Sequence, residues 1–390
     1  MAYLWVFLVS AGTTFALTPV VRRLVVRFGA IDQPSDRKVH PKATPTMGGL
    51  AMYVGFLAGL ALSRFLPYFS DMNAGSAEPL AAFVTCTAMV ALGAVDDKRG
   101  TSALAKLTAQ ILIGGVLILL GVQVLYFWLP GAGIVSVSSD LAVLLTILWM
   151  ILVVNAVNLV DGLDGLAAGM VAIAAASFFI YMSGTPSSFA FDASSAALLS
   201  AITVGICVGF LPWNFYPAKI FMGDSGSMLL GMLLTIATIS GVGRNPYRPS
   251  GGDLAAVAGT LLVPLLVLAI PFLDVALAVV RRTWRGKGIG TADKEHIHHR
   301  LMDIGHSHRG AVLLMYLWSA LISGIALAVG LIDGRLAVGA IALGAAILFA
   351  ITAYPRLDRW RSRVEGSQDE PSKERPPAAP GAEGTHRVEG

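Results

Sequence analysis

The sequence predicts an all-α fold: a polytopic integral membrane bundle of helices. Two observations on composition support this class, because 55% of the 390 residues are hydrophobic and only 13% are charged. A third is that the apolar residues come in long unbroken runs, whereas a soluble domain alternates apolar and polar faces. Runs of this length are what a helix needs to cross a lipid bilayer. We therefore expect a single membrane bundle without a separate soluble domain.

The apolar runs predict about eleven transmembrane helices. The first covers Tyr3 to Val21, and its basic residues follow it rather than precede it. A secretory signal has the opposite polarity, so we expect a retained helix with the N-terminus outside. The further runs lie at 48–66, 80–95, 103–121, 141–158, 166–183, 193–211, 227–241, 254–280, 311–330 and 336–354.

An odd number of spans puts the C-terminus in the cytoplasm, and the positions of Lys and Arg support this independently. The segments predicted to be inside hold 24 of the 28 basic residues, which is the usual bias of cytoplasmic loops. We divide the chain into a membrane domain, residues 1–354, and a cytoplasmic tail, residues 355–390. The tail is basic and rich in Pro, Gly and Glu, so it cannot bury a core and is expected to be disordered.

The stretch from Asn155 to Gly165, NAVNLVDGLDG, directly follows an apolar run. It spaces Asn155, Asn158, Asp161 and Asp164 three residues apart, which on a helix predicts nearly one polar stripe. No Lys or Arg lies in this stretch or beside it. Carboxylates at the negative end of a helix then need a cation from elsewhere. Asp164 also fits a plainer role as the N-cap of the next helix.

A second polar cluster is formed by the adjacent acids Asp96 and Asp97, with Lys106 about two turns into the following helix. Adjacent carboxylates at a helix C-terminus repel each other and the helix dipole. Lys98 and Arg99 follow immediately and could simply neutralise them, since exposed charges in loops are common.

The first predicted cytoplasmic loop contains Lys38 and ends in PTMGG, where Gly48 and Gly49 open a helix. Small residues there allow close helix packing or the approach of a phosphate, and we favour packing.

The loop from Trp213 to Ser227 places Asp224 and Ser225 just before another helix. These two residues suit a helix cap, but the flanking glycines also suit backbone amides open to an anion. Phe221 and its aromatic neighbours could stack on a base, or could belong to the aromatic belt at the membrane interface.

The last predicted cytoplasmic loop holds five of the seven histidines, within HIHHRL from His296 and in His306 and His308. No Cys joins this cluster, and the surrounding cations favour phosphate over zinc. Asp274 lies within the run 254–280, and a carboxylate inside a membrane span is a functional candidate, with a buried polar contact as its rival interpretation.

Together these loops place several carboxylates and many cations at the cytoplasmic face. Carboxylates without local cations suggest Mg²⁺, which prefers oxygen ligands and commonly bridges to substrate phosphates. Basic residues and glycines suggest the phosphates themselves. We expect phosphoryl transfer on a lipid substrate, and nothing in the sequence indicates a nucleic-acid partner.

Four motifs in this order, DDKRG from Asp96, NAVNLVDGLDG from Asn155, PAKIFMGDSGS from Pro217 and HIHHRL from His296, resemble the polyprenyl-phosphate N-acetylhexosamine-1-phosphate transferases. The histidine motif and the eleventh span resemble the N-acetylglucosamine-1-phosphate branch. The resemblance implies transfer of N-acetylglucosamine 1-phosphate from UDP-GlcNAc to undecaprenyl or decaprenyl phosphate, with release of UMP and a requirement for Mg²⁺ or Mn²⁺. It also implies a bacterial plasma (inner) membrane enzyme whose active site faces the cytoplasm, and a homodimer.

The resemblance further implies residue roles. Catalytic residues are Asp96, Asp97, Lys106 and Asp224. The metal is expected at Asp224 and Asn158. Substrate-binding residues are Lys38, Asp161, Asp164, Asn214, Phe221, His296, His298, His299 and Arg300; among them Asn214 and Phe221 match positions that hold the uridine.

Two alternatives stay open at this point. One is the same chemistry with another UDP-N-acetylhexosamine. The other is a proton-coupled secondary transporter, which predicts carboxylates near the midplane and inverted repeats; only Asp274 lies clearly within a span. Between direct attack by the lipid phosphate and a covalent aspartyl intermediate we favour direct attack, because positioning and charge neutralisation supply most of the catalysis in phosphoryl transfer. The sequence does not define the prenyl chain length or the glycopolymer that the product begins.

Overall fold

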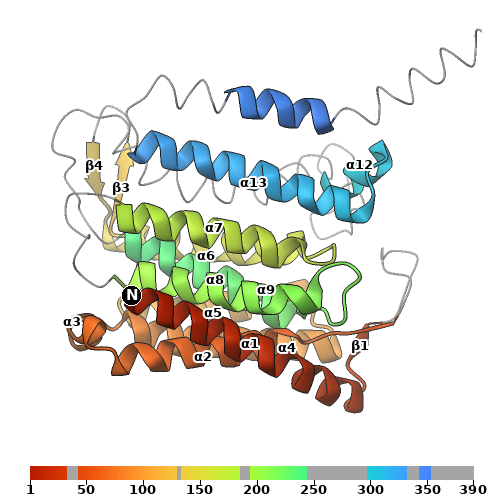
Figure 1. The fold of residues 1–390 in the computed structure, drawn as a ribbon. Helices are drawn as coiled ribbons and strands as arrows, with labels where there is room; N and C mark the ends of the chain where they lie inside the picture. The colour runs from red at the N-terminus through yellow and green to blue at the C-terminus, as the bar shows by residue number, and fades with distance from the viewer. Residues whose placement is uncertain (33–42, 130–132, 185–193, 244–296, 332–341, 353–390) are drawn as a thin grey trace, which may run out of the picture.

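Long helices built on the apolar runs make up the computed structural model (Figure 1). The structure describes residues 1–32, 43–129, 133–184, 194–243, 297–331 and 342–352. The helices that match predicted runs are α1 (Ala2–Arg27), α2 (Gly49–Phe65), α4 (Glu78–Arg99), α5 (Ala103–Leu119), α6 (Ser139–Val160), α7 (Leu166–Gly184), α8 (Ser195–Asn214), α9 (Gly223–Thr238) and α13 (His308–Leu331). A further apolar helix, Ala342–Thr352, lies within the predicted run 336–354.

Shorter elements lie between or beyond these helices. A 3-10 turn, η1 (Pro67–Phe69), and α3 (Ser70–Gly75) follow α2, a π-helical turn, η2 (Ile239–Gly243), continues α9, and α12 (Ile297–Ile304) precedes α13. Because α12 ends at Ile304 and α13 begins at His308, the predicted histidine loop is partly helical.

The chain is a helical integral membrane protein. Five of the described helices are long and apolar enough to cross a membrane, and a sixth span is reached if α2 and the segment after it, bent by 88° at Leu66, count as one. The predicted total of about eleven spans, the orientation and the tail stay predictions. The run 254–280 and the tail lie outside the described residues.

Two short hairpins depart from the all-α expectation. β1 (Ile31–Asp32) pairs with β2 (Thr44–Pro45), and β3 (Tyr126–Leu129) pairs antiparallel with β4 (Gly133–Ser136). The second hairpin connects α5 to α6, and its Tyr, Phe, Trp, Ile and Val residues favour strands. The sequence did not predict this hairpin because its residues are apolar, and hydropathy alone does not distinguish a short strand from the end of a helix.

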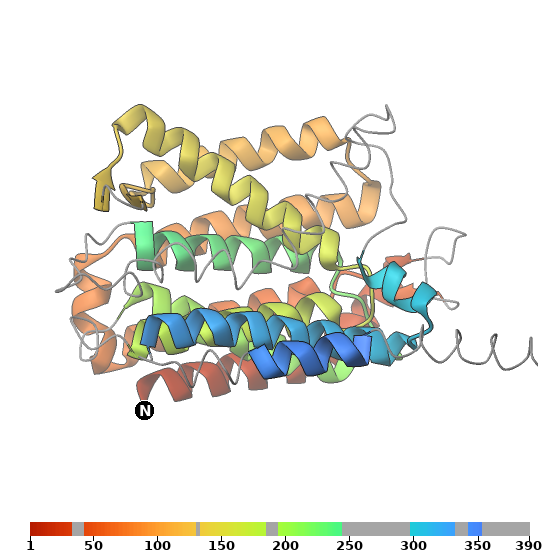
Figure 2. The same ribbon diagram turned by 90° about the horizontal axis from the view of Figure 1, so that it is seen from above.

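Helix α9 forms the centre of the bundle (Figure 2). Every residue from Ser225 to Thr238 is buried, as expected for a helix that is apolar on all sides. It packs against α2, α4, α6 and α8. The contact with α2 depends on Gly49, where a β-carbon would lie 2.1 Å from the amide nitrogen of Gly226. The structure therefore assigns Gly49 to helix packing, the interpretation favoured from the sequence.

Successive helices run in alternate directions, so one end of the bundle collects the predicted cytoplasmic loops. The C-terminal ends of α4, α6 and α8 meet the N-terminal ends of α2, α5, α7 and α9 there, while α3 and the β3–β4 hairpin lie at the opposite end (Figure 1). The start of α13 joins the same end, since Arg309 donates a hydrogen bond to the carbonyl oxygen of Tyr216 in the loop between α8 and α9.

Candidate active site

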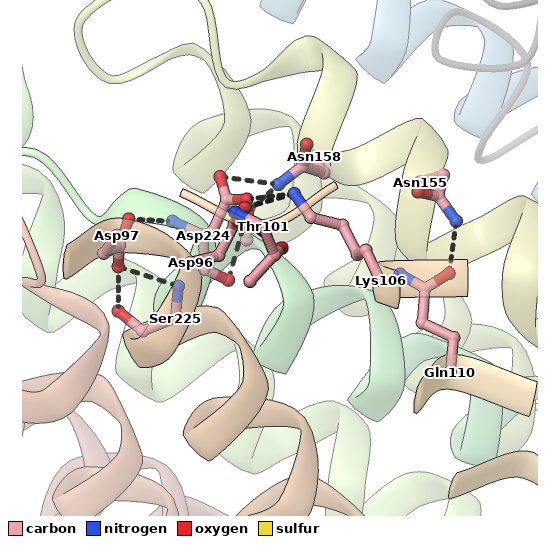
Figure 3. Close-up of polar contacts among 10 residues, drawn as sticks. Asp96, Asp97, Thr101, Lys106, Gln110, Asn155, Asn158, Asp224 and Ser225 are labelled. Carbon is pink, nitrogen blue, oxygen red and sulfur yellow. Dashed lines mark hydrogen bonds and ion pairs between the residues drawn. The ribbon is translucent and has the colours of Figure 1, made fainter. Parts of the chain in front are cut away.

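Asp97 holds the start of α9 from the last turn of α4 (Figure 3). Its carboxylate accepts hydrogen bonds from the backbone N–H of Asp224 at 2.8 Å, the backbone N–H of Ser225 at 3.1 Å and the Ser225 hydroxyl at 2.9 Å. The first N–H groups of a helix lack partners within the helix and attract negative charge. Asp97 therefore acts as an N-cap supplied by a different helix.

Asp96 faces a different set of partners. One of its oxygens accepts hydrogen bonds from the backbone N–H of Thr101, at 2.6 Å, and from the Thr101 hydroxyl, at 2.5 Å, and the other forms an ion pair with Lys106. The helix that carries Asp96 ends at Arg99 because Gly100, with φ of +67°, turns the chain towards α5. Lys98 and Arg99 are exposed, so Lys106, rather than these neighbours, pairs with the acid.

Lys106 joins two carboxylates that are far apart in the sequence. Its ammonium group also lies 2.5 Å from Oδ2 of Asp224, so α5 is tied to both α4 and α9. The side chains of Lys106, Asp96 and Asp224 are 20%, 12% and 28% exposed. The group is thus partly shielded from water but open enough to meet a substrate.

Asn158 completes the group from α6. Its amide nitrogen donates to Oδ1 of Asp224 and to the hydroxyl of Ser227, both at 2.9 Å. Figure 3 shows the side chains from four helices, α4, α5, α6 and α9, converging on Asp224. Four of the predicted residues, Asp96, Lys106, Asn158 and Asp224, are therefore brought into one network, and Asp97 is joined to it through the backbone of Asp224.

The predicted single stripe from Asn155 to Asp164 is divided by the structure. Asn155 and Asn158 lie on α6, but this helix ends at Val160, and Asp161 is its C-cap residue. The physical reason is the pair of glycines in DGLDG, which favour a turn over a continued helix. Asp164 accepts a hydrogen bond from the backbone N–H of Ala218 at 2.8 Å, so it braces the loop between α8 and α9.

Asp161 lies close to other carboxylates. Burial raises the pKa of its carboxyl well above the usual value, and the charges of Asp224, Asp97 and Asp164 raise this pKa further. Among the described residues the ion pairs at this end are those of Lys106 with Asp96 and Asp224. This end of the bundle therefore has more carboxylates than ion-paired cations, and it attracts positive charge.

The predicted uridine positions have different surroundings. Asn214 is only 2% exposed, and its amide accepts from the N–H of Gly165 and donates to the carbonyl of Ile220, both at 3.1 Å. It clamps the turn after α6 to the loop before α9. Phe221 is partly buried, and its backbone bonds to Pro45 and Gly48 fasten this loop to the start of α2. The uridine contact stays a prediction for both residues.

The remaining predicted residues fall into two groups. Lys38, His296 and Asp274 lie outside the described residues. His298, His299 and Arg300 fall in α12. The sequence did not single out two further residues, Thr101, which contacts the network through Asp96, and Gln110, which bonds to Asn155 beside it. Gln110 could have been found from its position one helical turn after Lys106, because residues four apart share a helix face.

A divalent cation fits this group on the chemistry of its donors. Within the described residues, no three side chains of His, Cys, Asp or Glu gather into a site that would hold a metal alone. Asp224 and Asn158 supply oxygen atoms, and Mg²⁺ commonly takes only one or two protein carboxylates and completes its shell with water and substrate phosphates. The negative charge of the carboxylates around Asp161 is of the sign that such a cation would neutralise.

Asp97→Asn is expected to weaken the start of α9. An asparagine would turn an N–H₂ group towards backbone donors, and an unpaired buried donor costs about 1–3 kcal/mol. We expect a lower melting temperature in detergent and activity reduced by about 10- to 100-fold, since that free energy also holds Asp224 in position. Asp140→Asn, an exposed acid in the first turn of α6, is the control. A wild-type melting temperature for Asp97→Asn would show that Asp97 does not anchor α9.

Comparison with known proteins places the chain in a family. The model of glycosyl transferase family 4 matches residues 79–242, which include α4 to α9 and the whole Asp224 network. Decaprenyl-phosphate N-acetylglucosaminephosphotransferase of Mycolicibacterium smegmatis is 40% identical over 360 residues, covering 90% of this chain and 88% of the relative. The Bacillus subtilis protein named "Probable undecaprenyl-phosphate N-acetylglucosaminyl 1-phosphate transferase" is 34% identical, covering 80% of each chain.

A second branch of relatives is more distant. Phospho-N-acetylmuramoyl-pentapeptide-transferase of Mycobacterium tuberculosis is 31% identical over 370 residues, covering 85% of this chain and 98% of the relative. Fold, network and relatives together define a membrane-embedded glycosyl or phosphosugar transferase. The chain belongs to glycosyl transferase family 4, the polyprenyl-phosphate N-acetylhexosamine-1-phosphate transferases. Membership of this family replaces the transporter alternative.

Proposed function

We propose that this enzyme transfers N-acetylglucosamine 1-phosphate from UDP-GlcNAc to a polyprenyl phosphate and releases UMP, the first membrane step of a cell-wall or surface glycopolymer. The observation that carries this proposal is the Asp224 network, which gathers Asp96, Lys106 and Asn158 at the partly exposed start of α9. The relatives with the higher identities, 40% and 34%, carry names for N-acetylglucosamine phosphate transfer to decaprenyl or undecaprenyl phosphate. These names support the donor sugar and the lipid acceptor.

The reaction proceeds as a single displacement in this proposal. An oxygen of the lipid phosphate forms a bond to the phosphorus that bears the sugar, and the anhydride bond to the UMP phosphate breaks. UMP leaves with the electron pair of that bond. In phosphoryl transfer the protein need not form a covalent bond to the substrate; catalysis depends on positioning and on the neutralisation of charge. Direct attack therefore needs no aspartyl intermediate.

Each residue of the network has a place in this scheme. Lys106, held between Asp96 and Asp224, presents a positive charge to phosphate oxygens. Asp97 sets the position of Asp224 through the backbone. Asp224 and Asn158 would hold Mg²⁺ or Mn²⁺, which when bound neutralises the diphosphate charge. Asp161, Asp164, Phe221, Lys38 and the histidine motif would contribute to binding of the nucleotide sugar.

The proposed setting is the bacterial plasma (inner) membrane, with the network on the cytoplasmic face. The basis is the bias of Lys and Arg towards the loops at this end, which is typical of cytoplasmic segments. We retain about eleven spans, an outside N-terminus, a cytoplasmic tail and a homodimer as parts of the proposal. Labelling of single cysteines introduced at the two ends of the bundle would test the orientation.

UMP release is the direct test of the proposed function. Purified protein with UDP-GlcNAc, decaprenyl phosphate and Mg²⁺ is expected to release UMP in equal amount to the lipid-linked sugar phosphate. A chelator should stop the release, and Mg²⁺ or Mn²⁺ should restore it, because the carboxylate network lacks the charge to bind a diphosphate alone. A panel of other UDP-N-acetylhexosamines decides the donor sugar. Protein that binds both substrates with metal but releases no UMP would refute the proposal.

A further inference from the structure

Gln110 is a buried polar residue next to the network. It lies on α5, one helical turn after Lys106, and is only 1% exposed. Its side-chain oxygen accepts a hydrogen bond from the amide nitrogen of Asn155 on α6 at 2.8 Å. Its side-chain nitrogen is buried and has no hydrogen-bond partner within the part of the chain that the structure describes. A buried donor left unpaired is costly, so an acceptor is expected there.

The orientation of this amide is fixed by its neighbours. The amide nitrogen of Asn155 also donates to the backbone carbonyl of Ile151 at 2.8 Å. A carbonyl oxygen can only accept, so Asn155 must turn its nitrogen to this side, and Gln110 must then offer Asn155 its oxygen. The nitrogen of Gln110 consequently faces away from Asn155 and towards Lys106 (Figure 3).

Lys106, one helical turn before Gln110, has a spare donor on its ammonium group, which points to Asp96 and Asp224. An ammonium group carries three N–H donors, and the carboxylates of Asp96 and Asp224 take two of them. Gln110 and Lys106 are separated by four residues and share a face of α5. Two donors cannot bond to each other, so each needs an acceptor, and different oxygens of one anion would serve both.

We propose that Gln110 is a substrate-binding residue and that its side-chain N–H, with Lys106, binds oxygens of a substrate phosphate. This inference rests on the proposed function, and it adds a phosphate-binding residue one turn further along α5 than Lys106. The phosphate is that of the polyprenyl phosphate or belongs to the diphosphate of the nucleotide sugar. Both present the same acceptor chemistry, and the kinetic measurements below separate them.

Gln110→Glu is the sharpest test. The variant keeps an oxygen for Asn155 but replaces the free N–H by a carboxylate oxygen, which repels phosphate. We expect the KM of one phosphate substrate to rise by about 10- to 100-fold, the range of a hydrogen bond to a charged group, with a smaller change in kcat. KM is measured for polyprenyl phosphate at saturating UDP-GlcNAc and for UDP-GlcNAc at saturating lipid. The substrate whose KM rises is the source of the phosphate.

The second variant is Gln110→Met, which removes both polar atoms but keeps a side chain of similar length. The matched control is Gln123→Glu, which lies beyond the far end of α5. Phosphate binding requires that Gln110→Glu impair binding at least as much as Gln110→Met. The alternative is that Gln110 only braces α5 against α6 or binds a water. In that case Gln110→Glu keeps the wild-type KM for both substrates, and Gln110→Met alone lowers the melting temperature. That result overturns the inference. If Gln110→Glu does not fold, unchanged KM values for Gln110→Met overturn it. Wild-type protein that releases no UMP would instead refute the proposed function.

Discussion

Asp224→Asn is expected to abolish transfer, with turnover lowered on the order of 10³-fold, while the protein stays folded and inserted in the membrane. Asp224 receives Lys106 on one oxygen and Asn158 on the other. Asparagine preserves the shape of the side chain but removes the charge that holds Lys106 and that would hold a divalent cation. UMP release at saturating substrates is the measurement of turnover.

Two further measurements separate a chemical from a structural effect of Asp224→Asn. The melting temperature in detergent should change little, because the backbone N–H of Asp224 that bonds to Asp97 is retained. Any rise in melting temperature that Mg²⁺ gives the wild-type protein with UDP should be lost. Asp71→Asn, an exposed acid on α3, is the control. Turnover near the wild-type value in Asp224→Asn would place the proposed metal elsewhere.

Gly93→Ala is expected to reduce activity by about 100-fold through a displacement of Asp224. Gly93 lies on α4, and a β-carbon there would be 2.5 Å from the backbone carbon and oxygen of Asp224 and from the α-carbon of Ser225. No side chain can move aside to relieve this overlap, because the atoms that it meets are backbone. Overpacking of this kind costs about 1–3 kcal/mol, so the melting temperature should fall as well.

The matched control for this variant is Gly115→Ala on α5, where a β-carbon meets nothing within 4 Å. Alanine is favoured over glycine within a helix by about 1 kcal/mol, so Gly115→Ala should keep wild-type turnover and equal or higher stability. Normal turnover and stability in Gly93→Ala would show that α4 and the start of α9 are not in the close contact described here.

The sequence predicted the residues of the site better than their contacts. Asp96, Lys106, Asn158 and Asp224 were all singled out from motifs, and the structure joins them in one network. Polar residues beside apolar runs are conspicuous because burying them is costly. The cation expected for the acids of the NAVNLVDGLDG stretch stays a prediction, because among the described residues Lys106 pairs with Asp96 and Asp224.

The contacts of several predicted residues became known only in three dimensions. Asp97 is adjacent to Asp96 in the sequence but caps α9, whereas Asp96 pairs with Lys106. Asn214 braces two loops. Hydropathy and spacing carry no information on which helix faces which, so neither assignment could be made before the helices were packed.

By itself the sequence determined the membrane class, ten of the described helices and the end of the bundle at which chemistry gathers, because apolar run length and charge bias are local properties of the chain. Only the tertiary structure decided that α9 is the central helix, that Asp97 supplies its cap and that Gln110 has an oriented N–H without a partner among the described residues. These features depend on contacts between residues 45 to 128 positions apart. Such contacts are set by helix packing around α9, which no local pattern encodes.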